Sequence, residues 1–264
     1  VGSYGRLDQN IEAAVGDEQK YVRLNTNRSL SNSYQDGDGN TVPSDWERWN
    51  ADLAFGWTPD ENTWLELTGG TADGEAMYAG RAMDGSQFKR ESLGLRFEKK
   101  NVTDVIKKIE AQVNYNFNDH VMDNFSLRQA PMKHDQATHE MYLDKSSMQV
   151  TRRTVNARMA VTHEWDKVQF ITGVDTQNNK HAGGMVSHSM NMPMKEDMHF
   201  NSYGGFGELS YQLSENNKLV SGVRVDQVKV EDLRQNSITK GFNRELDKTL
   251  ASGFIRFENA HPEH

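Results

Sequence analysis

A strict period of two is the feature that most limits how this sequence can fold. In the stretch WNADLAFGW, apolar and polar side chains alternate, and Trp49 and Trp57 stand at the two ends of the apolar face. These eight steps span roughly 26 Å at ~3.3 Å per residue. The same alternation recurs in residues 93–97, 109–117, 155–165, 168–174, 219–225 and 253–257. It predicts an all-β chain whose strands each have one apolar and one polar face.

The connections between these strands narrow the fold further. Short links are expected at residues 16–19, 58–62, 99–104, 166–167 and 214–217, and long ones at 34–45, 71–86, 119–147, 179–198 and 232–247. Because short and long links alternate, about eleven antiparallel up-and-down strands carry every long loop at one end. A soluble β-sandwich also alternates, but it has no reason to collect its long loops in this way. We therefore favour a transmembrane β-barrel over a soluble one.

Composition excludes several other classes of protein. The 264 residues carry a formal net charge of −8, which argues against nucleic acid as a partner. The sequence contains no run of about 18 apolar residues, so no transmembrane helix is predicted. The strands of a transmembrane β-barrel never show such a run, so a barrel is not excluded. Residues 1–4 (VGSY) are expected to form strand rather than signal peptide. No Gly-x-Ser-x-Gly motif or phosphate-binding loop is present, and the DGDG stretch at 36–39 is typical of a turn, so we do not expect an enzyme.

Methionine and histidine are concentrated in the predicted long loops. The chain has 12 Met and 9 His, and the densest run, HAGGMVSHSMNMPMKEDMHF, starts after residue 180. Methionine usually fills gaps in a core, and a loop histidine is usually solvated, but long polar loops have no core to fill. Thioethers suit Cu(I), and imidazole suits copper in either oxidation state. The secondary candidate copper ligands are therefore His181, Met185, His188, Met190, Met192, Met194, Met198 and His199.

The stretch VNYNFNDHVMDN contains the primary candidate pair, His120 and Met122. If the strand continues without a bulge, both side chains lie on the polar face that begins with Glu110, at the extracellular end of the strand. Residues two apart on one face lie ~6.5–7 Å apart at Cα, which is close enough to share one ion. In the alternative interpretation, His120 merely ends a strand and hydrogen-bonds a loop carbonyl.

Two segments of the sequence resemble a known family. The segments DGEAMYAGRAMDG and DHVMDN, within a match that is close over residues 2–130, resemble the TonB-dependent outer-membrane copper receptors of the OprC type. The resemblance implies a 22-stranded barrel closed by an N-terminal plug, about twice the strands expected here. The chain would then be residues 1–264 of a partial TonB-dependent receptor β-barrel domain, the N-terminal half of the barrel, without its plug.

The family also implies a function. The resemblance implies import of a copper ion, with Cu(I) held by an H-x-M pair on the barrel wall and by a Cys and a Met of the plug. The pair matches His120 and Met122, and the plug ligands have no match in this chain. The implied partners are copper, TonB and outer-membrane lipid, and the implied location is the outer membrane of a Gram-negative bacterium.

Two other interpretations remain open from the residues alone. A TonB-dependent receptor for a siderophore or another metal chelate is the main alternative, although such a receptor would be expected to line its mouth with aromatic residues and arginine. A structural or adhesive surface barrel is the third interpretation, in which the methionine-rich loops would be incidental.

Overall fold

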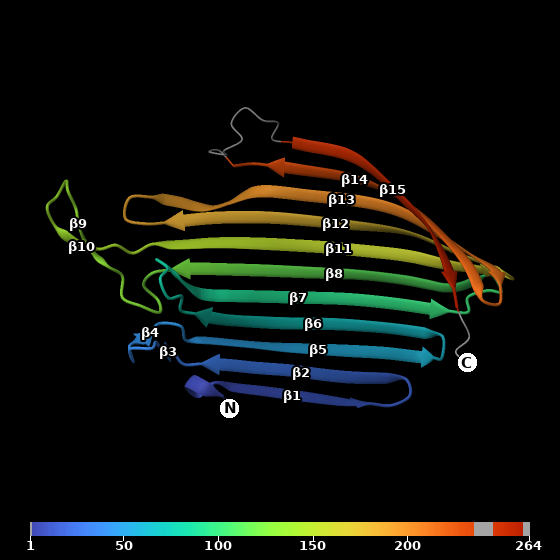
Figure 1. Cartoon of the computed structure of the whole chain (residues 1–264), viewed down its shortest axis with the longest axis horizontal. Coiled ribbons are helices and arrows are strands. Elements are labelled where there is room, and N and C mark those ends of the chain that lie inside the picture. Colours follow the sequence, from blue (N-terminus) through green and yellow to red (C-terminus); the bar gives the residue numbers. More distant parts are fainter. Residues whose placement is uncertain (1, 235–244, 261–264) are drawn as a thin grey trace.

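The chain forms one continuous antiparallel sheet (Figure 1). The structure, a computed structural model, describes residues 2–234 and 245–260. Eleven strands pair in the order β1-β2-β5-β6-β7-β8-β11-β12-β13-β14-β15, so neighbours in the sheet are successive long strands of the sequence. The all-β, up-and-down architecture with eleven strands, predicted from alternation, is confirmed.

The strands are long, as expected for a barrel wall. The eleven of the main sheet are β1 (Leu7–Gly16), β2 (Lys20–Ser31), β5 (Trp46–Asp60), β6 (Thr63–Ala76), β7 (Asp84–Lys100), β8 (Ile106–Asp123), β11 (Ser147–Trp165), β12 (Val168–Val186), β13 (Asn191–Ser214), β14 (Asn217–Asp232) and β15 (Glu245–Asn259). Two small hairpins stand apart from it: β3 (Tyr34–Gln35) with β4 (Thr41–Val42), and β9 (Met132–His134) with β10 (Met141–Leu143).

The two ends of the sheet differ as the sequence predicts. The tight turns between β1 and β2, β5 and β6, β7 and β8, β11 and β12, and β13 and β14 lie at one end, at the right of Figure 1. The hairpins β3–β4 and β9–β10 lie in connections at the opposite end. We call this second end the loop end.

Two of the expected long loops are shorter than predicted. The connection between β6 and β7 spans residues 77–83, and that between β12 and β13 spans only residues 187–190. The expectation of a loop over 179–198 is therefore wrong, because β12 and β13 continue to pair there, with register shifts beside Ala182 and Gly184. Most of the expected loop at 232–247 lies outside the described residues.

The first residues also depart from the expectation of strand. Ser3–Gly5 is a turn of 3-10 helix in which Tyr4 has a φ of 57°, and β1 begins only at Leu7. No helix in the described part of the chain is long and apolar enough to cross a membrane.

The two faces of the sheet have opposite chemistry. One face, called here the apolar face, leaves large apolar side chains open: Phe55 is 49% exposed and Val113 is 47% exposed. The other face, called the polar face, carries side-chain bonds between neighbouring strands, including Asn114 to Asn156 at 3.1 Å and Arg158 to Glu110 at 3.2 Å. A single sheet has no second layer to cover its apolar face, so few side chains form a buried core.

Candidate metal site

His120 and Met122 lie on the polar face at the loop end of β8. The pairing of β8 with β11 runs without a register shift from Lys108 to Asp123, so the strand contains no bulge in this stretch. Side chains two residues apart in a regular strand point to the same face. His120 and Met122 therefore share the face of Glu110, which was the condition for treating them as one site.

The His120 imidazole is packed but lacks a hydrogen-bond partner at one nitrogen. Its direct neighbour on β7 is Phe88, and the two rings are stacked with centroids 4.5 Å apart and planes at 29°. Within the described residues, His120 Nε2 is the one buried side-chain nitrogen or oxygen with no hydrogen-bond partner. A buried polar atom without a partner is costly, so the nitrogen is available for a ligand. Nε2 makes no hydrogen bond to any described loop carbonyl.

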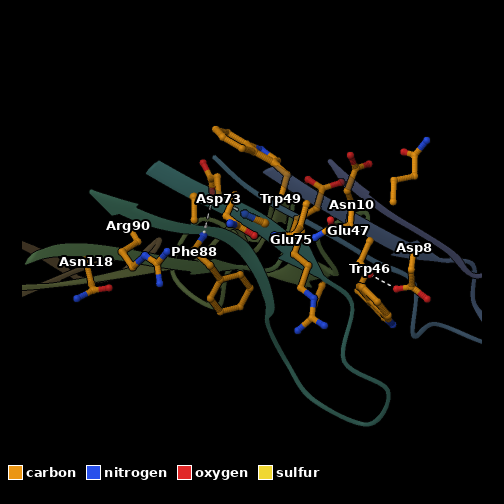
Figure 2. A pocket seen from close by; sticks show the side chains of 18 residues that line it. Asp8, Asn10, Trp46, Glu47, Trp49, Asp73, Glu75, Phe88, Arg90 and Asn118 are labelled. Atoms are coloured by element: carbon orange, nitrogen blue, oxygen red, sulfur yellow. Dashed lines mark hydrogen bonds between the residues drawn. The ribbon is translucent and has the colours of Figure 1, made fainter. Parts of the chain in front are cut away.

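Phe88 itself is held by its neighbours (Figure 2). Its backbone N–H donates to Asp73 Oδ1 at 3.0 Å, drawn as a dashed line in Figure 2. Its ring lies over Gly85, where a Cβ would stand 2.2 Å from the ring. One feature of the sequence could have identified Phe88. It is an aromatic residue at a polar-face position of β7, whereas Leu93 and Leu95 occupy apolar-face positions.

Cross-strand pairing places four methionines in one row. Met122 of β8 is the direct partner of Met148 on β11, which pairs with Met185 on β12, which pairs with Met192 on β13. Direct antiparallel partners point to the same face and stand about 4.5–5.5 Å apart at Cβ. The row therefore runs along the polar face from Met122 to the β12–β13 hairpin, and we call it the methionine row.

The other secondary candidates are scattered. Met198 and His181 pair directly on the polar face, and His181 is four residues from Met185 along β12. The Met194 sulfur lies 3.0 Å from where a Cβ on Gly184 would stand, so it is on the opposite side from Met185. Met190 is 45% exposed in the turn at 187–190.

Three of the candidate histidines already have carboxylate partners. His181 Nδ1 contacts Asp197 at 2.5 Å, and His188 Nε2 lies 3.3 Å from Asp135. In the same way, the His199 ring lies between two carboxylates, with Nε2 2.7 Å from Glu196 and Nδ1 3.4 Å from Glu231. Within the described residues no three His, Cys, Asp or Glu side chains form a group that could hold a metal ion. Methionine sulfur is therefore the main additional donor near His120.

A buried ion pair fixes the loops beside the site. Asp84 is completely buried, and both Nε and Nη2 of Arg128 donate to its carboxylate. The same guanidinium donates to the carbonyls of Arg81 at 3.2 Å and Tyr78 at 3.0 Å. Since Asp84 pairs directly with Asp123, this Arg128–Asp84 clamp ties residues 77–83 to the end of β8.

A cavity of about 940 Å³ opens next to Phe88 (Figure 2). Its walls come from β1, β2, β5, β6, β7 and β8, and it is lined mainly by polar and charged side chains. Arg90 and Asn118, which follow Phe88 and His120 down the polar face, are part of this lining. His120 therefore lies beside a recess whose lining residues are mostly polar or charged, rather than in an apolar core.

One solved structure matches almost the whole chain at substantial identity. It is described as "Copper transporter OprC", with 43% identity, a TM-score of 0.83 and coverage of 99% of this chain. The present chain spans 43% of that protein. No curated protein matches the chain.

More distant structures share the fold alone. The ferric-catecholate import receptor Fiu from E. coli K12 has 11% identity and a TM-score of 0.64, covering 97% of this chain and 46% of that one. P. aeruginosa FpvA, solved with bound pyoverdine, has 8% identity and a TM-score of 0.71, covering 99% of this chain and 39% of that one.

The family comparison agrees with these structures. The family described as "TonB dependent receptor-like, beta-barrel" matches residues 25–259. This family and the solved structures are receptors and transporters, in agreement with the prediction that the chain is not an enzyme. The resemblance predicted from DGEAMYAGRAMDG and DHVMDN is confirmed, and the chain belongs to the TonB-dependent receptor β-barrel family.

Proposed function

We propose that this chain is part of an outer-membrane receptor that takes up copper as Cu(I), with His120 and Met122 as the barrel's share of the binding site. The single observation that carries the proposal is the buried, unpartnered Nε2 of His120, two residues from a thioether on the same face. A neutral imidazole and a thioether bind Cu(I) without adding charge, and burying a neutral assembly costs less than burying a bare ion. Similarity to the copper transporter supports the choice of ion.

The two faces of the sheet support a place in the outer membrane. The apolar face exposes side chains such as Phe55, Trp57 and Val113, which lipid would cover. The polar face would line the barrel interior, where a plug domain supplies the remaining ligands and TonB supplies the energy. A thiolate from that plug would neutralise the charge of Cu(I).

The methionine row supports a collecting role for the secondary residues. Met148 is 38% exposed and Met192 is 53% exposed, so both are open to an arriving ion, and the row ends at Met122. Soft donors at directly paired positions on four strands would pass Cu(I) from one thioether to the next. We propose that these residues deliver the ion and that His120 and Met122 hold it.

Single substitutions in the collecting set are expected to have small effects. We expect Met190→Ala, Met192→Ala or Met194→Ala to lower copper uptake only at limiting copper, because each is one of several methionines at the loop end of β12 and β13 and none is the sole donor there. Uptake is measured as cell-associated copper over a range of supplied copper concentrations, with Met159→Ala on the apolar face as control. Complete loss of uptake from any one of the three changes would contradict a shared collecting role.

Copper accumulation by cells tests the function as a whole. Cells that express the intact receptor should accumulate more copper than cells without it, and deletion of TonB should remove the difference. The same cells should gain nothing from ferric chelates supplied as the iron source. Growth on such a chelate, without a copper effect, would favour the siderophore-receptor alternative.

A further inference from the structure

We infer that Phe88 is a positioning residue of the copper site, and that Nε2 is the nitrogen of His120 that binds the ion. The inference rests on the proposed function and goes beyond it, because it names the coordinating atom and the residue that aims it. Phe88 lies on the neighbouring strand and stacks on the imidazole, with ring centroids 4.5 Å apart.

The stack limits how the imidazole can turn. A histidine ring rotates freely about χ2 unless its surroundings restrict it, since that torsion is broad. A flat ring at 29° to the imidazole plane covers one side of it and blocks rotation out of the plane. In this orientation Nε2 is buried and makes no hydrogen bond within the described residues. The nitrogen is therefore held ready for an ion before the ion arrives, which reduces the ordering cost of binding.

Phe88 can hold the imidazole because it is fixed on two further sides. The Phe88 ring packs against Gly85, and any side chain at that position would clash with the ring. On the side of β6, the pairing of β6 with β7 is irregular between Ala72 and Ala76. Phe88 therefore has no paired residue on β6 to accept a hydrogen bond from its backbone N–H. Asp73 replaces the missing ladder acceptor: its Oδ1 accepts from Phe88 N at 3.0 Å and from Gly74 N at 2.7 Å (Figure 2).

The arrangement differs from simple packing in one respect. A phenylalanine that served only to fill space would be expected on the apolar face, with Leu93, Leu95 and Phe97 of the same strand. Phe88 instead lies on the polar face, and most residues that line the cavity beside it are polar or charged. Residues that orient a metal ligand typically change metal affinity about 10–100-fold when they are replaced.

The test is Cu(I) affinity of the intact, detergent-purified receptor, measured by competition with a chromogenic Cu(I) chelator. Phe88→Leu should weaken binding by about 10–100-fold, whereas Phe88→Tyr, which keeps the ring, should bind like the wild type. Gly85→Ala should weaken binding as Phe88→Leu does, because its methyl group displaces the ring. Asp73→Ala should weaken it more than Asp73→Asn, whose amide oxygen still accepts the Phe88 N–H.

Spectroscopy separates positioning from loss of structure. X-ray absorption at the copper edge should show a weakened nitrogen contribution and an unchanged sulfur contribution in Phe88→Leu. Phe117→Leu, on the apolar face of β8, is the matched control and should change neither spectrum nor affinity. Replacing His120 by histidine methylated at Nδ1 leaves Nε2 free and should preserve binding.

The outcomes distinguish this inference from the proposed function. If His120→Ala loses copper while Phe88→Leu and Gly85→Ala bind normally, the positioning role is wrong and the function stands. Loss of binding with the Nδ1-methylated residue would overturn the assignment to Nε2. If His120→Ala itself binds copper normally, the proposed site fails together with everything that depends on it.

Discussion

Replacing either His120 or Met122 by alanine is expected to weaken Cu(I) binding by the intact receptor by more than about 100-fold, which is more than the replacement of a residue that only orients a ligand typically causes. Under the proposed function, each change would remove one donor atom from the same ion, and the remaining donors on this wall would not complete the site. His120 contributes the buried Nε2 without a partner, and Met122 contributes the thioether at the inner end of the methionine row.

The double variant decides whether the two residues act on one ion. His120→Ala with Met122→Ala should bind little more weakly than either single variant, because effects on a shared ion are not additive. Affinity is measured by the chelator competition described above, on protein whose barrel is shown to be folded. Additive losses would mean two separate ions, and wild-type affinity in the double variant would leave only the collecting residues as sites.

Matched controls are available within the same sheet. Met159→Ala removes a methionine that is 50% exposed on the apolar face, and it should leave Cu(I) affinity unchanged. His163→Ala removes an imidazole near the turn end of β11, far along the strand from the site. If both control variants also lost affinity, the losses at His120 and Met122 would reflect a general effect of substitution and would not identify a binding site.

The second large effect is expected in the Arg128–Asp84 clamp. Arg128→Ala leaves the buried Asp84 carboxylate without its cation, and breaking a buried pair in this way costs about 3–5 kcal/mol. The hydrogen bonds from Arg128 to Asp84 raise the pKa of the arginine above its usual value, so the guanidinium keeps its charge. Residues 77–83 would lose their anchor, because Arg128 also holds the Tyr78 and Arg81 carbonyls.

The loss should appear locally rather than as unfolding of the whole barrel. Hydrogen exchange in residues 77–83 and 124–128 should accelerate in Arg128→Ala, while the strands at the turn end keep their protection. Arg6→Ala, in an ion pair whose two side chains are both about half exposed, is the control and should change little. Replacing the pair together, with Asp84→Leu and Arg128→Met, should restore part of the protection, since no buried charge then remains alone. Unchanged exchange in Arg128→Ala would mean that the clamp does not hold these loops.

Much of the sheet was predictable because alternation is a local property. Trp49 to Trp57 and Ile109 to Phe117 each show two faces within one strand, and no distant partner is needed to see them. The same holds for His120 and Met122, which are two residues apart in a strand that stays regular. Only the absence of a bulge had to be established by the structure.

The β12–β13 hairpin shows where local patterns failed. Gly183, Gly184 and the His/Met run break the alternation and are typical of a loop, yet these residues pair across a tight turn at 187–190. Two register shifts accommodate the irregular stretch, and one of them separates Met192 from Met194. A bulge flips the side chains that follow it, so the face of each methionine could not be read from the sequence.

The sequence by itself determined the strands, their two faces and the pair His120–Met122, because each depends on neighbours within one or two residues. The tertiary structure alone decided that Phe88 covers His120, that four methionines form one row, and that Arg128 reaches Asp84. The physical reason is register. Contacts between strands depend on which residue stands opposite which, and bulges beside Ser86 and Gly184 set this by a single-residue shift.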